Sequence, residues 1–482
     1  MTKSKTDKYY ETYDYNSRRP VQIELETLRE DQQKRLIESK VFCMIPWTHI
    51  HGFPTGEAYP CCLGEMEHPI GNMRTNTLEE IWNGDAYKDM RQNMLNDNSC
   101  KECTRCYEQE EQGFFSMRNS SNKHFGHHIE KVDQGIDPDF ELVYWDIRFS
   151  NQCNMACAYC DVKSSSKWQH EIKTQGHYPT SGMYNNTEWL ERDRSLPIPY
   201  SKPNPYRDAF WKWWPDLFPN LHTFRITGGE PLLHNDTFKV LDYIIENPTF
   251  NPNIELCINS NLSVPNERWE EFVDKVKYIT DNDLVCNFVL FTSIEAEGKQ
   301  AEYIRDGLDS KLLWSRVNEF LTKCEKPEVT IMAAFNALSI SSYHKVIQKI
   351  HKIKKIYGSS KRYRDYSIIL DTSYIRHPEF LDFRILTPDW LERINELSRL
   401  MEDLGMHKYE HVDGYYEVGF FDFEREKVRR MTDMFTDNKE WLDKQRKDFV
   451  LFIDEYDKRR GKNFLETFPE MEDFYHSCKK LI

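Results

Sequence analysis

From residue 141 onward, short apolar runs rich in Val, Ile and Phe alternate with stretches that carry helical periodicity. Apolar runs of this length predict strands, and the amphipathic stretches between them predict helices. Strands that alternate with helices indicate parallel βα units and the α/β class, and six units predict a partial (β/α)6 barrel similar to a TIM barrel. The predicted strands cover 141–150, 222–227, 254–259, 287–294, 328–336 and 367–374, and the predicted helices cover about 236–246, 266–276, 311–324 and 342–356.

The pattern differs on either side of this region. Residues 1–35 are polar and predict a flexible arm, about 20 residues long, followed by a leading helix within 21–39. Residues 36–120 predict a small cysteine-rich domain, with a helix over 77–95 that a Thr77/Glu80 capping box opens. Residues 121–140 are weakly patterned and predict a linker, 141–385 form the predicted barrel, and 386–482 predict a helical C-terminal extension.

One long insertion, 161–220, interrupts the βα rhythm after the first predicted strand. It contains little regular periodicity and a tryptophan cluster at 211–214. Irregular segments of this length inside compact domains often bind ligands. Packing of the tryptophans onto the barrel is an equally favoured interpretation.

Charge and cysteine content narrow the class of protein. The 482 residues include 64 Lys and Arg against 79 Asp and Glu, a net charge of −15 that argues against general nucleic-acid or anionic-membrane binding. Neither an apolar run of about 20 residues nor the apolar core of a signal peptide is present, so we expect a cytoplasmic protein. In a reducing compartment, 13 cysteines in close clusters favour metal ligands over disulfides.

Cys153, Cys157 and Cys160 follow the first predicted strand in the spacing Cx3Cx2C. In parallel βα folds the chemistry lies at the C-terminal ends of the strands. Three thiolates can hold three irons of a four-iron cluster and leave the fourth iron open. The spacing, with Tyr159 before the last cysteine, resembles the signature loop of the radical S-adenosylmethionine (radical SAM) superfamily. The resemblance implies a 4Fe-4S cluster on these cysteines, with SAM as the ligand of the open iron.

The resemblance covers roughly residues 141–380 and includes a glycine motif. Thr227-Gly228-Gly229-Glu230-Pro231 follows the second predicted strand and resembles the motif that contacts the SAM amino group. Glycines allow backbone to approach a ligand closely, and a carboxylate can pair with an ammonium group. Gly228, Gly229 and Glu230, with Tyr159, are therefore predicted SAM contacts.

Polar residues after the later strands complete the predicted SAM site. The segment from Ser293 to Arg305 resembles a subfamily segment, which implies that these two side chains hold the SAM carboxylate, and guanidinium is a natural bidentate partner for that group. A surface arginine is the alternative. Asn259, Asn261 and Asn336 stand where the family often contacts ribose or substrate, although asparagine at strand ends also serves ordinary turns.

The N-terminal cysteines form a second group. Cys43, Gly56 and Cys61, followed by Cys100-x2-Cys103-x2-Cys106, resemble the twitch type of auxiliary-cluster domain, which is related to the longer SPASM domain. The resemblance implies a second 4Fe-4S cluster on four cysteines, and a structural zinc site is the alternative. Cys103 with Cys106 is favoured over Cys100 with Cys103 as the closing pair, so the predicted ligands are Cys43, Cys61, Cys103 and Cys106.

The order of the two regions departs from the usual one, in which the auxiliary domain follows the barrel. The inversion puts in doubt where an auxiliary cluster would lie relative to substrate. Cys257, Cys286 and Cys324 have apolar contexts typical of core residues. The histidines lack a clear set of partners, so surface or supporting roles are favoured over metal binding for His49, His51, His124, His127 and His128.

Taken together, the resemblance implies an enzyme that reductively cleaves SAM to a 5′-deoxyadenosyl radical and abstracts hydrogen from a peptide or small polar substrate. The auxiliary cluster would assist oxidation or bind substrate, and a reductant such as flavodoxin or ferredoxin would be a partner. Two alternatives remain open. One is a non-catalytic iron-sulfur or zinc scaffold, and the other is a radical SAM methyltransferase or ring-forming enzyme with structural zinc.

Overall fold

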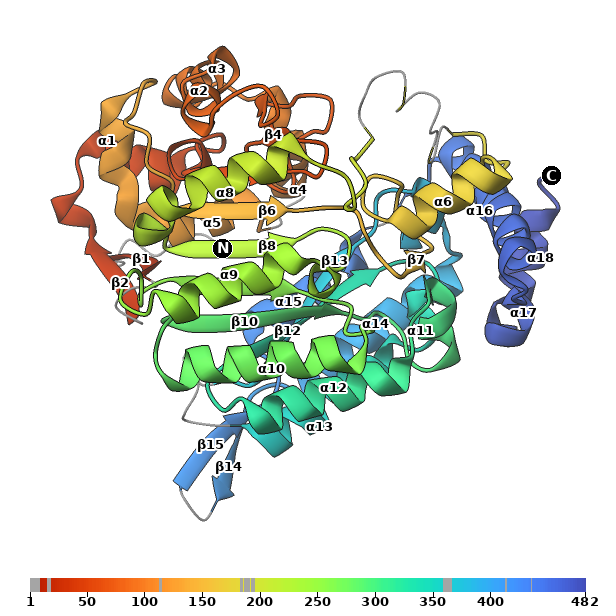
Figure 1. Cartoon of the computed structure of the whole chain (residues 1–482). Helices are drawn as coiled ribbons and strands as arrows, with labels where there is room; N and C mark the ends of the chain where they lie inside the picture. Colours follow the sequence, from red (N-terminus) through yellow and green to blue (C-terminus); the bar gives the residue numbers. More distant parts are fainter. Residues whose placement is uncertain are drawn as a thin grey trace.

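A nine-stranded sheet forms the centre of the computed structural model (Figure 1), which describes residues 9–14, 19–111, 115–182, 185, 191, 196–358, 366–411, 414–434 and 436–482. Six parallel strands lie side by side in chain order: β6 (Tyr144–Arg148), β8 (Thr223–Thr227), β9 (Glu255–Asn259), β10 (Asn287–Ser293), β12 (Glu328–Phe335) and β13 (Ile368–Tyr374). The predicted α/β class and all six predicted strands are confirmed.

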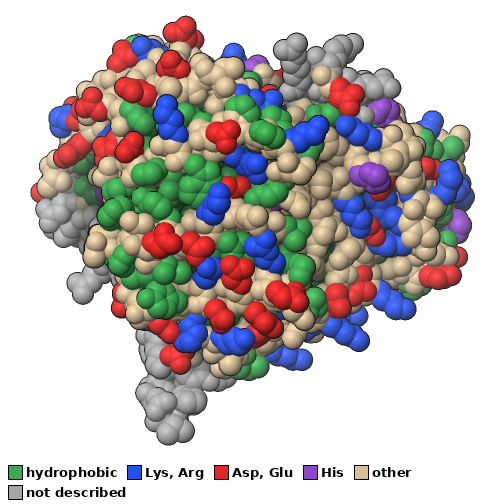
Figure 2. Space-filling view, in the orientation of Figure 1, with side chains coloured by type: hydrophobic (Ala, Val, Ile, Leu, Met, Phe, Trp, Pro, Cys, Tyr) green, Lys and Arg blue, Asp and Glu red, His purple; other side chains and the backbone are tan. Residues whose placement is uncertain are grey.

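Helices connect these strands and cover one face of the sheet (Figure 1). They are α8 (Pro205–Leu217), α9 (Asn235–Glu246), α10 (Asn266–Asp281), α12 (Ser310–Lys323) and α13 (Tyr343–Tyr357). Charged side chains gather over α10 and α12, and hydrophobic side chains over α8 and α9 (Figure 2). Short elements lie between them: α11 (Lys299–Ile304), β11 (Arg305–Asp306), η6 (Phe218–Asn220), η7 (Pro231–Leu233), η8 (Ser339–Ser341), η9 (Glu379–Leu381) and η10 (Phe383–Ile385).

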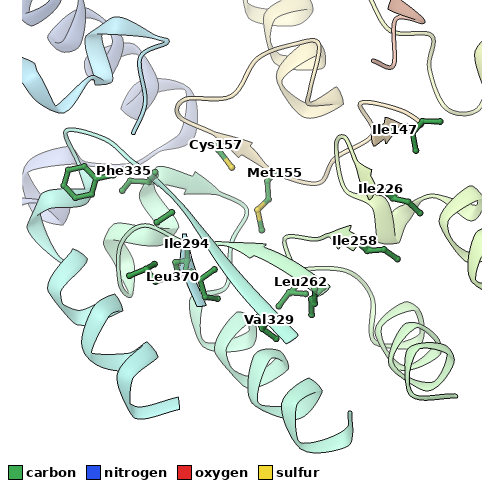
Figure 3. Close-up of a cluster of buried hydrophobic side chains, with 14 of the residues drawn as sticks. Ile147, Met155, Cys157, Ile226, Ile258, Leu262, Ile294, Val329, Phe335 and Leu370 are labelled. Carbon is green, nitrogen blue, oxygen red and sulfur yellow. The ribbon is translucent and has the colours of Figure 1, made fainter. Parts of the chain in front are cut away.

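The register gives the sheet two chemically different faces. Ile147, Ile226 and Ile258 are register partners on β6, β8 and β9, and all three are fully buried (Figure 3). The residues that alternate with them on the opposite face are polar, among them Asp146 and Arg225. Because side chains of a strand alternate between faces, the register fixes which residues of β6, β8 and β9 share each face, whereas β10 adds the apolar residues Val289 and Phe291 to the second surface. We call the second surface the polar face, and it carries Asp146, Arg148, Arg225, Asn259, Ser293 and Met332.

The cysteine-rich region continues the same sheet. Its strand β3 (His49–Gly52) pairs in parallel with β6, and the antiparallel strands β4 (Glu57–Tyr59) and β5 (Gly71–Asn72) extend the sheet further. The capping box is confirmed, because Thr77 Oγ1 accepts from the Glu80 amide at 3.1 Å and Glu80 Oε2 from the Thr77 amide at 2.8 Å. Instead of one helix over 77–95, α2 (Leu78–Trp82) and α3 (Asp85–Leu95) are separated at Asn83 and Gly84.

The N-terminus differs from the flexible arm that the sequence predicts. Strands β1 (Tyr9–Asp14) and β2 (Arg19–Glu24) pair in an antiparallel hairpin, and residues 1–8 and 15–18 lie outside the described part of the chain. Tyrosine, threonine, valine and isoleucine in these segments favour strands over disorder. The helical part starts later than expected, with η1 (Leu25–Thr27), α1 (Glu30–Gln33) and η2 (Lys34–Glu38).

The predicted linker 121–140 is largely helical. It is occupied by the end of α5 (Met117–Phe125) and by η5 (Gly126–Gln134). The other short elements before α5 are η3 (Ile45–Trp47), η4 (Lys101–Cys103) and α4 (Thr104–Glu111). Phe125, Ile129 and Val132 are buried in the core. Packing of these few apolar residues therefore stabilises helical structure in a segment that is polar overall.

The long insertion contributes α6 (Ser166–Gln175) and α8, while its residues 183–184, 186–190 and 192–195 lie outside the described part of the chain. Trp214 of α8 is fully buried against Phe224 of β8, with ring centroids 4.5 Å apart. Phe210 stacks on Trp214 at 5.2 Å. For Trp214, packing onto the sheet is therefore the interpretation that the structure supports.

The C-terminal region is mainly helical, and its long helix α16 lies beside the end of the sheet where the parallel strands terminate (Figure 1). Its elements are α14 (Pro388–Asp403), β14 (His407–His411), β15 (Gly414–Val418), α15 (Asp422–Arg429), η11 (Arg430–Asp433), α16 (Lys439–Arg460), α17 (Phe464–Thr467), η12 (Pro469–Met471) and α18 (Glu472–Lys479). Among the helices that the structure describes, none combines the length and apolar character needed to cross a bilayer.

Candidate functional site

The loop after β6 brings Cys153, Cys157 and Cys160 within electrostatic range of one another at the C-terminal edge of the parallel strands. The Cys160 amide donates to the Cys157 carbonyl at 2.9 Å, which folds the loop back on itself. The short strand β7 (Ala156–Cys157) pairs with β11, so that Cys157 lies opposite Arg305. Figure 3 shows Cys157 on this loop, with Met155 beside it. Burial raises the pKa of the Cys153 thiol to about 12, so a metal that binds here must displace thiol protons.

Gly228 and Gly229 lie against the cysteine loop itself. The Gly229 amide donates to the Ser150 carbonyl at 3.0 Å, and the Glu230 amide to the Gln152 carbonyl at 2.8 Å. Gly228 has φ +121°, and a Cβ on Gly229 would lie 2.3 Å from the Gln152 oxygen. The glycines are thus required for close approach of two backbone segments, whereas the sequence predicted close approach to a ligand.

Glu230 is fully buried and lies within electrostatic range of Cys153. Its carboxylate accepts hydrogen bonds from the Ser260 hydroxyl at 2.8 Å, the Asn261 amide at 2.6 Å and the Leu232 amide at 3.0 Å. Burial raises the pKa of Glu230 to about 7, although these donors favour the carboxylate. The Asn261 side chain in turn lies 3.9 Å from Cys153 Sγ, which links the carboxylate to the cysteine loop.

Arg305 is buried and already has an anionic partner, Glu295. Its Nε lies 3.0 Å and its Nη2 2.6 Å from Glu295 Oε2, while Nη1 lies 4.0 Å from Cys157 Sγ. The Tyr159 hydroxyl donates to the same Glu295 oxygen at 3.2 Å. The surface-arginine alternative does not fit this burial. The sequence did not predict that Glu295 pairs with Arg305. The position of Glu295 after an apolar strand could have indicated it, because a buried carboxylate requires a cationic partner.

The remaining predicted SAM contacts lie in different surroundings. Ser293 and Asn259 are both on the polar face, where Asn259 Oδ1 accepts from Arg225 Nε at 3.1 Å. Asn336 is fully buried; its Nδ2 donates to the Ala334 carbonyl at 3.0 Å, and its Oδ1 accepts from the Leu338 backbone amide at 3.0 Å. These two local hydrogen bonds are those of an ordinary turn, the alternative that the sequence left open for Asn336.

The polar face carries charged residues that the sequence did not single out. His51 Nδ1 of β3 lies 3.3 Å from Asp146 Oδ2 of β6, and the Thr227 hydroxyl donates to Asp146 Oδ1 at 3.0 Å. Burial opposes the charge on Asp146, but His51, Arg225 and Arg148 outweigh it and hold the pKa of this carboxyl below its usual range. The buried carboxylate of Asp146, with Arg148 and Arg225 close to it, shows that this face can hold charged groups.

Four N-terminal cysteines meet in one small cavity, which we call the cysteine pocket. Cys43, Cys61, Cys103 and Cys106 line it, the four cysteines that the sequence favoured as ligands. Cys100 does not line it, and its thiol donates to the Met90 carbonyl at 3.6 Å. Cys62 is exposed and lies within electrostatic range of Asp146 and Arg225 on the polar face.

Local structure explains how this pocket forms. Gly56 has φ +87° in the turn between β3 and β4, and this turn returns the chain to Cys61. Cys103 and Cys106 are one helical turn apart at the junction of η4 and α4. Arg118 joins the segments, because Nη1 donates to the Phe42 carbonyl at 2.7 Å and Nε to Glu110 Oε1 at 2.8 Å.

No curated protein matches the chain well enough to count as a relative. One protein-family model does match, and it covers the part of the chain that contains the cysteine pocket. A match over this short span favours iron-sulfur over zinc for the four clustered thiols. Residues 43–107 match the SPASM family of iron-sulfur cluster-binding domains.

Proposed function

We propose that the chain is a radical SAM enzyme that abstracts hydrogen from a peptide or small polar substrate, with an auxiliary 4Fe-4S cluster in the SPASM region. The six parallel strands in chain order would then be a partial (β/α)6 barrel. The observation that carries the proposal is the packing of Gly228 and Gly229 against the loop of Cys153, Cys157 and Cys160. Two motifs more than 60 residues apart thus meet at the edge where parallel βα folds bind their ligands.

The three thiols of this loop fit an iron-sulfur cluster with one open iron. When bound, the cluster and SAM supply the one-electron cleavage that yields methionine and a 5′-deoxyadenosyl radical able to abstract hydrogen. The chain's own task is to hold SAM in a fixed position and to keep water away from it. The deep burial of Cys157 and Ala156 in the loop serves that exclusion.

Glu230 and Arg305 are the charged groups available to SAM. Glu230 would pair with the SAM ammonium group through the carboxylate that Ser260 and Asn261 orient. Arg305 would use Nη1, because Glu295 already engages Nε and Nη2. Tyr159, Ser293 and Asn259 are proposed as further contacts around the same ligand.

The polar face would bind the substrate. Asp146 and Arg148 lie on β6, which pairs with β3 of the SPASM region and leads into the cysteine loop, and Arg225 lies on the neighbouring β8. A face that carries two guanidinium groups and one carboxylate suits a substrate with polar or charged groups, such as a peptide. The opposite face is closed by apolar packing and offers no comparable site among the described residues.

The auxiliary cluster would occupy the cysteine pocket and assist oxidation or bind substrate. Although the SPASM region precedes the barrel in the chain, β3 pairs directly with β6, and Cys62 next to the pocket lies within electrostatic range of Asp146. Both features support an auxiliary site close to the polar face. An external reductant such as flavodoxin or ferredoxin would deliver the electron to the first cluster.

An anaerobic assay for 5′-deoxyadenosine tests the proposal. Reconstituted wild-type protein with SAM and a chemical reductant should form 5′-deoxyadenosine, and Cys157→Ala should not. Cys324→Ala is the matched control, since Cys324 is also buried but lies at the end of α12. Absence of SAM cleavage in wild-type protein with full iron content would refute the enzyme. Iron analysis should give about eight irons per wild-type chain, against about four if the cysteine pocket holds zinc.

A further inference from the structure

Three histidines from two separate segments meet at the N-terminal end of the parallel strands, the end opposite to the cysteine loop. His127 and His128 belong to η5, and His222 directly precedes β8. One ring nitrogen from each lies within 4.8 Å of the other two. The ring centroids of His127 and His128 are 4.0 Å apart, and those of His128 and His222 are 4.9 Å apart.

The fold holds both segments firmly. The His222 amide donates to the Val143 carbonyl at 2.8 Å, and the His222 carbonyl accepts from the Glu255 amide at 2.8 Å, so its backbone is tied to both neighbouring strands. On the other segment, Ile129 and Val132 bury η5 in the core. The backbone departs from helical values at His128, with φ −94° and ψ 17°, at the point where the two consecutive rings converge.

The chemistry of the three rings suits a metal ion. Nε2 of His128 is buried and has no hydrogen-bond partner among the described residues. Lys131 lies within electrostatic range of His128, and its ammonium group is paired with Glu141.

We propose that His127, His128 and His222 form a metal site for a divalent transition ion, with zinc as the first candidate. Imidazole ligands suit zinc, copper, nickel and iron, and three histidines with a solvent ligand are a known tetrahedral set. Zinc-nitrogen bonds of about 2.0 Å place ligand nitrogens about 3.3 Å apart, so a shift of about 1 Å in each ring closes the site.

The position indicates a structural role. His222 lies at the N-terminal end of β8, whereas the cysteine loop follows the C-terminal end of β6. In parallel βα folds the N-terminal ends of the strands contribute stability and the C-terminal ends chemistry. A bound ion would fasten η5, which leads from the SPASM region into β6, to the start of β8. This site does not depend on the proposed SAM chemistry.

The test uses full-length protein whose iron-sulfur clusters have been reconstituted anaerobically, because free cysteines would otherwise bind zinc. After incubation with Zn²⁺ and removal of the excess, wild-type protein should retain about one zinc per chain, in addition to its iron. Zinc-edge X-ray absorption should show nitrogen ligands at about 2.0 Å and lack the sulfur shell at about 2.3 Å. Zn²⁺ should also raise the Tm.

His128→Gln and His222→Gln should lose the retained zinc and the Tm increase while keeping the wild-type iron content. His177→Gln, at an exposed histidine, is the control and should behave as wild type. Zinc that both Gln variants retain with unchanged ligands would overturn the proposal, and so would a sulfur shell around zinc in the wild type. If a variant fails to fold, the absorption spectrum of wild-type protein decides alone, since a nitrogen shell supports the site and its absence refutes it.

Discussion

Arg305 and Glu295 form a buried ion pair directly beside Cys157. Nη2 of Arg305 lies 2.6 Å from Glu295 Oε2, and its Nη1 lies 4.0 Å from Cys157 Sγ. Both side chains are at most 8% exposed, so the pair is held away from solvent. The carboxylate fixes the plane of the guanidinium and leaves one nitrogen directed at the cysteine loop. Arg305 is therefore oriented before any ligand arrives.

This geometry predicts that Arg305→Lys weakens SAM binding. Lysine keeps the charge but cannot bond Glu295 through two nitrogens and still present a third to a ligand. We expect SAM affinity to fall at least about tenfold, which corresponds to about 1.4 kcal/mol, with iron content unchanged. Equilibrium dialysis with reconstituted protein measures this. Arg316→Lys is the matched control, because Arg316 is also buried but bonds the Leu262 and Val264 carbonyls. Equal affinity in Arg305→Lys and wild type would remove Arg305 from the site.

Glu230 predicts a pH dependence of SAM binding. Its pKa is raised to about 7 by burial, so the carboxylate is mainly protonated below pH 7 and mainly charged above it. Only the charged form attracts an ammonium group, so affinity should increase up to about tenfold per pH unit from about pH 5 to 7 and then level off. Glu230→Gln should give a weaker and flatter profile.

Binding isotherms at several pH values provide the measurement for Glu230. Glu246→Gln, at the end of α9, serves as the control and should keep the wild-type profile. A wild-type profile that is flat between pH 5 and 8 would contradict a role for Glu230 as the partner of the SAM ammonium group.

We predict that Gly229→Ala loses the cluster of the Cys153–Cys160 loop and keeps the other one. The added Cβ would lie 2.3 Å from the Gln152 oxygen, and real Cβ atoms do not come so close to backbone. The cysteine loop must therefore move, and three thiols that no longer converge lose their cluster. We expect iron content to fall by about four per chain, while the SPASM region keeps its iron. Gly182→Ala, where a Cβ meets no atom within 4 Å, should leave iron unchanged.

The chain pattern predicted the sheet because each parallel strand is buried on its helix-covered face, which leaves a strong apolar imprint such as Ile226 and Ile258. The resemblance to auxiliary-cluster domains likewise predicted the four thiols of the cysteine pocket, whereas spacing alone left Cys100 and Cys106 equally suitable as partners of Cys103. Contacts between distant segments have no comparable pattern in the sequence. The ion pair of Glu295 with Arg305, the placement of β3 beside β6 and the meeting of His128 with His222 all depend on tertiary packing. Local propensity also failed at η5, where core packing outweighs polar composition.

A second buried ion pair predicts how the C-terminal region stabilises the sheet. Lys354 of α13 lies 2.8 Å from Glu424 Oε2 of α15, and Glu424 Oε1 accepts from the Leu370 amide of β13 at 2.8 Å. Glu424→Ala leaves a buried ammonium and an unpaired amide, so the free energy of unfolding should fall by about 3–5 kcal/mol. The double variant Lys354→Met/Glu424→Leu should recover part of this loss. Urea unfolding measures both, and a loss below about 1 kcal/mol for Glu424→Ala would contradict the argument.

Cys106 and Cys100 distinguish the ligands of the SPASM region. Cys106 lines the cysteine pocket, whereas Cys100 lies outside it with its thiol toward the Met90 carbonyl. Both are buried, so truncation to alanine removes a similar volume from the core in each case. Cys106→Ala should lose about four irons per chain if the pocket holds a four-iron cluster, and Cys100→Ala should keep them. The reverse result would make Cys100 and Cys103 the closing pair. The Cys100 thiol would then have to exchange its contact with the Met90 carbonyl for a place in the pocket beside Cys103, which its side chain already contacts.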